Sequence, residues 1–230
     1  MSAPTERLFS RTNTNVARAL LDDYLPPAVR ESAPFRWAVK AWLGKNCIPD
    51  FKEQAFGMSD EEFAEAYRKT YVGMNGGRRS SDTTDLQMDW ILANSGKPPR
   101  SILEIGSHKG ILAQRLAEAG HAVQTLDLSG PGLTGCAEHI PLPDQSVDVI
   151  VLAHVIEHVR SLTRAFLELA RVSREQVLIV TPRQRFYKWT FDYHLHFFYS
   201  VAHLCSYAHC GAAAGELIEG DICMNWSVKP

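Results

Sequence analysis

The sequence has no excess of positive charge. Its 230 residues include 24 Lys and Arg against 26 Asp and Glu, which gives a formal net charge of −2 at pH 7. A protein that binds nucleic acid mainly through the phosphate backbone needs a basic surface to offset the phosphate charge. We therefore expect no nucleic-acid partner of this general kind.

The sequence also lacks a long apolar segment. Its longest uninterrupted apolar run is Val149–Ala153, whereas a membrane-spanning helix needs about 20 apolar residues. The first residues contain no apolar stretch typical of a secretory signal. The 5 cysteines are odd in number and scattered, as is common for reduced thiols. From these features we expect no membrane span and a cytoplasmic location.

Two phosphate-binding motifs are missing as well. Between Gly106 and Gly110, the dinucleotide motif Gly-x-Gly-x-x-Gly would need its second glycine where His108 stands. Lys109-Gly110 does not have the Gly-Lys-Ser/Thr order of a P-loop. An NAD-dependent reductase is therefore disfavoured.

The composition that is present, 45% hydrophobic and 22% charged, is typical of a folded globular protein. In the first part of the chain, Ser59 and Glu62 form a capping-box pattern that predicts the start of a helix. A further helix is predicted from residue 82 or 83 to residue 94. Its expected apolar stripe is Leu86, Trp90 and Ala93. We expect residues 1–96 to form a helical extension or cap on residues 97–230.

The pattern changes after Pro99 to short apolar segments separated by helical ones. The predicted strands are Ser101–Ile105, Ala122–Leu126, Val147–Leu152 and Val177–Val180. One predicted helix ends at Gly120, and another contains the apolar positions Val155, Val159, Leu162, Phe166 and Leu169. Apolar strands that alternate with such helices favour an α/β, doubly wound, mainly parallel sheet. We expect Glu216–Ile222 and Met224–Val228 to complete it.

Polar residues at the ends of the first two strands predict the ligand. Ligands of open parallel sheets bind beyond the carboxyl ends of the strands. There, Glu104 adds negative charge beside the Gly106–Gly110 turn, which suits a cationic or zwitterionic ligand better than a diphosphate. Asp127, 21 residues beyond Gly106, can accept hydrogen bonds from ribose hydroxyls. A glycine turn, an acidic strand end and no phosphate site together indicate S-adenosylmethionine.

At these positions the sequence resembles the class I S-adenosylmethionine-dependent methyltransferases, in particular the type 11 group. The matching stretches are Ile102–Gly110, Thr125–Leu128, Ala137–Asp148 and Val151–Val159. The resemblance extends over about residues 99–182. It implies a Rossmann-like sheet, S-adenosylmethionine as the cofactor and methyl transfer as the activity.

The resemblance also implies which residues hold the methionine part of the cofactor. Glu104, Gly106 and Gly110 match the first motif of the family, which wraps this part. Ser107 and His108 would line the same turn.

For the nucleoside, Asp127 matches the ribose-binding acid and Leu128 the apolar neighbour of the adenine. Many relatives use an Asp or Asn for the adenine amino group, but this chain has Cys136 there, which is a weak hydrogen-bonding partner. Adenine recognition would then depend on the backbone of Ala137. His154 matches a position that lines the sulfonium end.

The segment 186–199 contains 8 aromatic residues in 14, and its aromatic and polar positions alternate. In an extended chain, this alternation would place His194 and His196 on the side of the acceptor. In the alternative interpretation, the aromatic residues are simply core and the histidines lie on the surface. We predict His194 or His196 as a general base, with His158 as a further candidate. Glu157 and His158 could instead form a solvated turn.

No metal is expected, because the His and Cys residues between 194 and 210 lack the paired spacing of most zinc sites. The segment 51–63 resembles leaders of bacterial methyltransferases that act in surface-sugar or secondary-metabolite synthesis. We therefore expect O- or N-methylation of a small-molecule or sugar/glycan acceptor. A catalytically silent S-adenosylmethionine-binding sensor or assembly protein is the alternative hypothesis.

Overall fold

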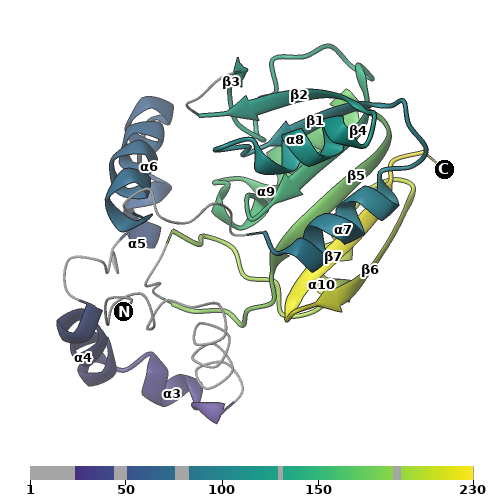
Figure 1. Cartoon of the computed structure of the whole chain (residues 1–230). Helices are drawn as coiled ribbons and strands as arrows, with labels where there is room; N and C mark the ends of the chain where they lie inside the picture. Colours follow the sequence, from purple (N-terminus) through teal and green to yellow (C-terminus); the bar gives the residue numbers. More distant parts are fainter. Residues whose placement is uncertain (1–23, 44–50, 76–82, 129–131, 189–192, 230) are drawn as a thin grey trace, which may run out of the picture.

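A computed structural model describes residues 24–43, 51–75, 83–128, 132–188 and 193–229 (Figure 1). Within these ranges, the side chains of residues 39, 42, 43 and 68–75 fall outside the description. No helix in the described part of the chain combines the length and the hydropathy needed to cross a membrane.

A seven-stranded sheet forms the centre of the fold, in the order β3-β2-β1-β4-β5-β7-β6. The strands are β1 (Ser101–Ile105), β2 (Ala122–Asp127), β3 (Leu133–Thr134), β4 (Val147–Ala153), β5 (Ser173–Pro182), β6 (Ala212–Ile218) and β7 (Asp221–Ser227). The first five are parallel, and β7 runs antiparallel to both β5 and β6. The four predicted strands of the parallel part are confirmed, although β5 is longer than expected and β3 was not predicted.

Helices cover both faces of the sheet, which confirms the predicted doubly wound α/β fold (Figure 1). Helices α7 (Asp85–Asn94) and α8 (Ile111–Glu118) pack on one face, and α9 (Leu162–Val172) and α10 (Val201–Cys205) pack on the other. Neighbouring strand residues point to opposite faces, so Ile102 belongs to the first core and Leu103 to the second. This explains why the strands are apolar almost throughout.

The β6–β7 hairpin confirms that the end of the chain completes the sheet, but its turn lies earlier than predicted. Glu219 and Gly220 have φ values of +52° and +86°, so the turn lies between Ile218 and Asp221. Two central residues with positive φ match the twist of a two-residue hairpin. The predicted break near Cys223 is therefore wrong, and Cys223 is a buried strand residue.

The helix predicted to include Val155 and Val159 is shorter than expected. It begins at Leu162, because the Ser161 side chain accepts a hydrogen bond from the Arg164 N–H and caps α9 there. Residues before it form a short 3₁₀ helix, η3 (Ile156–His158). This break allows the residues after β4 to turn back over the edge of the sheet.

The apolar stripe predicted for α7 is also wrong. Leu86 is exposed, whereas Met88 and Ile91 are buried against the sheet. The Gln87 side chain completes a capping box with Thr84 and donates a hydrogen bond to the Asp221 carboxylate, which turns this face inward.

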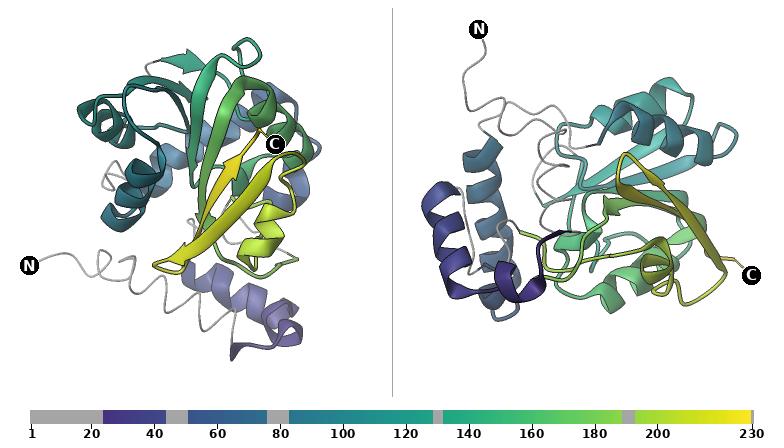
Figure 2. Two further views of the ribbon diagram at one scale, coloured as in Figure 1. Left: turned by 90° about the vertical axis from the view of Figure 1, so that its right-hand side faces the viewer. Right: turned by 90° about the horizontal axis from the view of Figure 1, so that it is seen from below.

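The N-terminal helices α3 (Pro27–Arg30), α4 (Ala33–Leu43), α5 (Phe51–Ala55) and α6 (Asp60–Asn75) lie to one side of the sheet (Figures 1 and 2). The predicted capping box at the start of α6 is present, with Ser59 and Glu62 each accepting from the backbone N–H of the other. Phe51 and Phe63 pack against Tyr193 and Leu195 in a separate apolar cluster. The division of the chain at residue 96 stays a prediction.

The core under α9 allows a direct test of the fold. Phe166 is fully buried, whereas its neighbour Leu167 is 52% exposed. We predict that Phe166→Ala lowers the free energy of unfolding by about 3–5 kcal/mol, because it leaves a cavity. Leu167→Ala is the matched control and should change it by no more than about 0.5 kcal/mol. Urea unfolding measures both, and equal losses would contradict the packing described.

Candidate functional site

The Gly106–Gly110 turn follows β1 at the carboxyl edge of the sheet, by which we mean the edge where β1, β2, β4 and β5 end. Gly106 and Gly110 both have positive φ, and the Gly110 N–H donates to the Ser107 carbonyl at 2.7 Å. A Cβ added at Gly106 would lie 2.3 Å from Val155 Cγ2. Only glycine therefore fits between the turn and the segment that follows β4.

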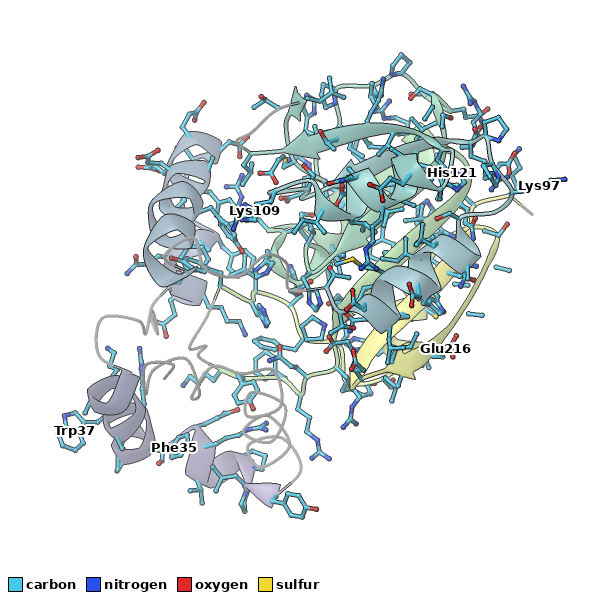
Figure 3. The ribbon with its side chains drawn as sticks, viewed as in Figure 1. Phe35, Trp37, Lys97, Lys109, His121 and Glu216 are labelled. Carbon is cyan, nitrogen blue, oxygen red and sulfur yellow. The ribbon has the colours of Figure 1, made fainter. Side chains whose placement is uncertain are left out.

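The turn is joined to the end of β2. The Gly106 N–H donates to the Leu126 carbonyl at 2.8 Å, and the His108 N–H donates to Asp127 Oδ2 at 2.9 Å. Leu128 follows and is partly buried. Lys109 lies on the side of the sheet that faces α6, whereas Lys97 and His121 lie at the opposite edge (Figure 3). The structure thus brings the predicted turn and the predicted ribose acid together.

Glu104 lies buried beneath this turn. It is 5% exposed, and its Oε2 accepts no hydrogen bond from the described residues. Burial raises the pKa of Glu104 to about 7, the nearby Asp127 carboxylate adds to this rise, and the Ala113 backbone N–H opposes it. A carboxylate held in this way favours a ligand that brings a positive charge or a hydrogen-bond donor.

Cys136 and Ala137 lie just after β3. The Gly135 N–H donates to the Asp127 carbonyl at 3.0 Å, which holds this segment beside the end of β2. Burial raises the pKa of the Cys136 thiol, so that the thiol stays protonated near neutral pH. The Ala137 side chain packs in the core. The adenine contacts of both residues stay predictions.

His154 begins the segment after β4, with a φ of +57°. Its Nδ1 is 3.6 Å from Glu157 Oε1, and its Nε2 is 3.6 Å from Asp221 Oδ2. His154 therefore lies between two buried carboxylates, and a positive charge on its ring would be favourable there.

Glu157 corrects one interpretation of the sequence, because it is not part of a solvated turn. It is 1% exposed, and its Oε2 accepts a hydrogen bond from Thr181 Oγ1 at 3.0 Å. Its backbone carbonyl accepts from the N–H groups of Leu195 and His196. Burial alone would raise the pKa of Glu157, but the neighbouring imidazoles outweigh it and lower the pKa to about 2. The carboxylate is therefore ionised.

His158 and His194 meet next to Glu157. Their ring centroids are 4.8 Å apart. His158 Nδ1 is 3.1 Å from the Tyr193 carbonyl, and His194 Nδ1 is 2.6 Å from Gln184 Oε1. The Tyr67 ring of α6 packs edge-on against His158, with centroids 5.5 Å apart. The helical extension thus reaches the candidate site.

His196 is placed apart from this pair. Its ring faces Phe56, with centroids 6.4 Å apart, and burial lowers its pKa. The expected alternation is present in the described part of the segment, where Tyr193, Leu195 and Phe197 are buried. Residues 189–192 lie outside the described residues. The catalytic roles of His158, His194 and His196 stay predictions.

Comparison with known proteins finds a family that matches the parallel part of the sheet. The type 11 family model, described as a methyltransferase domain, matches residues 103–181, from β1 to β5. This match covers about a third of the chain and supports a class I S-adenosylmethionine-dependent methyltransferase domain over these residues. The match contains the turn, Asp127 and the His154–His158 segment.

Curated relatives are similar to this chain over part of its length. A ubiquinone biosynthesis O-methyltransferase of Aromatoleum aromaticum is 38% identical over 63 residues, which cover 27% of each chain. An uncharacterized methyltransferase of Mycobacterium ulcerans is 31% identical over 121 residues, which cover 45% of this chain and 48% of the relative. The chain spans less than half the length of these relatives.

Among solved structures, the fold is similar to that of the 1,6-didemethyltoxoflavin-N1-methyltransferase of Burkholderia thailandensis. The TM-score is 0.61, the identity is 13%, and the similarity covers 75% of this chain and 92% of that chain. At this identity the similarity supports the fold alone.

Several residues of the site were not predicted from the sequence. Thr181 and Gln184 orient Glu157 and His194, and Tyr67 comes from a helix about 90 residues before His158 in the chain. The end of β5 marks Thr181 as a residue of the carboxyl edge, but no sequence signal identifies Tyr67 or Gln184.

The close contact at Gly106 can be tested with a second glycine. Gly120 also has positive φ, but a Cβ there would meet Pro98 only at an ordinary distance of 3.5 Å. We predict that Gly120→Ala costs about 1 kcal/mol of backbone strain, and that Gly106→Ala costs about 1–3 kcal/mol more because of the clash with Val155. Urea unfolding of both variants gives the difference. Equal losses would show that Val155 does not restrict this position.

Proposed function

We propose that the chain transfers a methyl group from S-adenosylmethionine to an oxygen or nitrogen of a small-molecule or glycan acceptor. The observation that carries this proposal is the hydrogen bond from the His108 N–H to Asp127, which joins a glycine turn to a strand-end carboxylate. Imidazole and carboxylate groups lie at the same edge of the sheet, where an acceptor could be aligned.

The residues at the turn fit this cofactor. Glu104 is a buried carboxylate whose Oε2 has no hydrogen-bond donor among the described residues, and the cofactor carries an ammonium group. Gly106 leaves no side chain between the turn and Val155, so the turn packs directly on the segment after β4, whereas the space beside Gly110 is open to a ligand. When bound, the cofactor supplies a methyl group that is already activated on a sulfonium.

Each residue of the turn and its neighbours then has a role. Glu104 binds the ammonium end, with Ser107, His108 and Gly110 shaping the turn around it. Asp127 accepts hydrogen bonds from the ribose hydroxyls. The nucleoside extends toward the remaining predicted contacts, which are Leu128, Cys136 and Ala137. His154 lies on the sulfonium side.

We assign the acceptor to the side of His158 and His194. Alignment for in-line attack contributes more to this reaction than acid–base chemistry, because the methyl donor is reactive already. Tyr67 contacts His158 and would limit the size of the acceptor from the side of the helical extension. The name of one similar protein, an O-methyltransferase, supports an oxygen acceptor.

The first experiment measures binding of S-adenosylhomocysteine by calorimetry. We predict that Asp127→Ala weakens binding by at least about tenfold, because two hydrogen bonds to the ribose are lost. The control is Asp89→Asn on the exposed side of α7, which should leave binding unchanged. If Asp127→Ala binds as the unmodified protein does, the assignment of the nucleoside is wrong.

Binding alone does not separate an enzyme from a silent sensor or assembly protein. Methyl-labelled S-adenosylmethionine should therefore be incubated with the protein and a small-molecule extract, and the products analysed by mass spectrometry. We expect a labelled small-molecule product. Cofactor binding without a product in any extract would favour the silent alternative.

Glu104 predicts a pH dependence of cofactor affinity. Because its raised pKa is about 7, the carboxyl group of the free protein is protonated below that pH. The positive end of the ligand favours the ionised form, so affinity should rise by about tenfold from pH 6 to pH 8. Glu104→Gln should bind more weakly at pH 8 and with a flat profile. Calorimetry with S-adenosylhomocysteine tests this, with Glu118→Gln as control, and a steep profile in Glu104→Gln would exclude Glu104 as the titrating group.

A further inference from the structure

We propose that Glu157, His158 and His194 form a binding site for one divalent cation of the first transition row. One oxygen or nitrogen atom from each residue can be chosen such that all three lie within 4.8 Å of one another. The site lies at the carboxyl edge, next to His154, and thus on the acceptor side of the proposed cofactor position. Glu157 has no role in the methyl transfer proposed above.

In both His158 and His194, a hydrogen bond at Nδ1 makes Nε2 the ring nitrogen that can bind a metal ion. The Tyr193 carbonyl can only accept, so His158 Nδ1 donates to it and His158 Nε2 carries the lone pair. The Gln184 amide oxygen fixes His194 in the same way. Metal-binding histidines commonly have their second ring nitrogen held by a carbonyl or carboxylate in this manner.

Glu157 supplies the negative charge of the site. Thr181 Oγ1 donates to Oε2, which leaves Oε1 on the side of the imidazoles, 3.9 Å from His158 Nε2. Oε1 is buried and accepts no hydrogen bond within the described part of the chain. A carboxylate with a desolvated oxygen gains from a cation that reaches this oxygen. This buried oxygen has imidazole nitrogens of His154 and His158 at 3.6 and 3.9 Å but accepts no hydrogen bond from the described residues, and it is a second observation that points to a ligand.

The three ligand atoms lie farther apart than the ligand atoms around a bound ion. Zinc lies about 2.0–2.2 Å from nitrogen and oxygen ligands, which places ligand atoms about 3–3.5 Å apart. The side chains would thus have to move together by about 1 Å. The Glu157 carbonyl holds Leu195 and His196, so the segment that carries His194 is already fixed against η3.

The donor set selects the kind of ion. Two imidazoles and one carboxylate suit Mn²⁺, Fe²⁺, Co²⁺ or Zn²⁺, whereas Mg²⁺ and Ca²⁺ prefer oxygen ligands alone. Three protein ligands leave further coordination positions for water or a substrate. This arrangement is typical of catalytic rather than purely structural sites.

The open positions indicate the acceptor class, and this step rests on the proposed methyl transfer. A cation beside the methyl donor lowers the pKa of an acceptor hydroxyl, so the site favours an alcohol or phenol. The hydroxyl proton passes to solvent water, the oxygen forms a bond to the methyl carbon, and the carbon–sulfur bond breaks with its electron pair left on sulfur. The products are a methyl ether and S-adenosylhomocysteine. His158 and His194 then act as ligands rather than as general bases.

The test is a titration of the chelator-treated full chain with Co²⁺, followed by the visible absorption of the bound ion. We expect one ion per chain and the d–d bands of a site with nitrogen ligands. His158→Ala and His194→Ala should each weaken binding by at least about tenfold. His209→Ala is the matched control, since His209 is exposed and lies against Trp226 away from the site, and it should bind Co²⁺ normally.

A milder variant covers the case in which an alanine variant does not fold. Thr181→Val keeps the shape of the side chain but removes the hydrogen bond to Glu157, and it should weaken Co²⁺ binding by about tenfold with folding intact. Absence of Co²⁺ binding in the unmodified protein would overturn the proposal. The proposal would also be overturned if Thr181→Val and the folded histidine variants bound Co²⁺ as tightly as the unmodified protein does.

Failure of this inference can be told apart from failure of the proposed function. Binding of S-adenosylhomocysteine without Co²⁺ binding would remove the cation site and leave methyl transfer in place. Co²⁺ binding without any methyl transfer would keep the cation site and remove the acceptor assignment. Ion-dependent transfer to nitrogen acceptors alone would also remove the hydroxyl assignment.

Discussion

A carboxylate buried in η3, just after β4, organises the carboxyl edge of this protein. Glu157 is desolvated, and an ionised group there is stable only with compensating partners. It obtains them from Thr181 on β5 and from the imidazoles around it. Its own backbone carbonyl holds the segment that contains His194. Glu157 thus ties the chain that follows β5 to the chain that follows β4, and the contacts of His158 with Tyr193 and His194 add to this connection.

A second close contact joins this region to the glycine turn. Val155 packs where a side chain at Gly106 would otherwise lie. The His108 N–H of this glycine turn donates a hydrogen bond to Asp127. The proposed cofactor residues and the proposed acceptor residues are therefore coupled by packing, and a shift in the segment after β4 would move both. This coupling fits a reaction that depends on alignment more than on proton transfer.

The elements that depend on a local sequence pattern could be predicted, whereas the features that depend on contacts between distant residues could not. The parallel strands, the start of α6 and the residues of the glycine turn follow from apolar runs, a capping box and glycine spacing, and the structure has the strands and the capping box as expected. The extent of α9 could not be read from periodicity, because Val155 and Val159 continue its spacing although Ser161 starts the helix. The buried face of α7 depends on the contact between Gln87 and Asp221, which lie on distant parts of the chain. The prediction of a solvated turn at Glu157 was wrong for the same reason, because Thr181, which donates a hydrogen bond to Glu157, lies on β5. Zinc-type spacing rules did not detect the cluster, because its third member, His194, is 36 residues from His158.

In the proposed arrangement, the methyl donor and a cation lie side by side at one edge of the sheet. The most direct test is proton NMR of the S-methyl group of S-adenosylmethionine in the presence of the protein and Mn²⁺. We expect strong paramagnetic relaxation of these protons, its loss on displacement of Mn²⁺ by Zn²⁺, and its absence in His194→Ala with cofactor binding retained. Unchanged S-methyl relaxation while both Mn²⁺ and the cofactor are bound would exclude a cation next to the methyl donor.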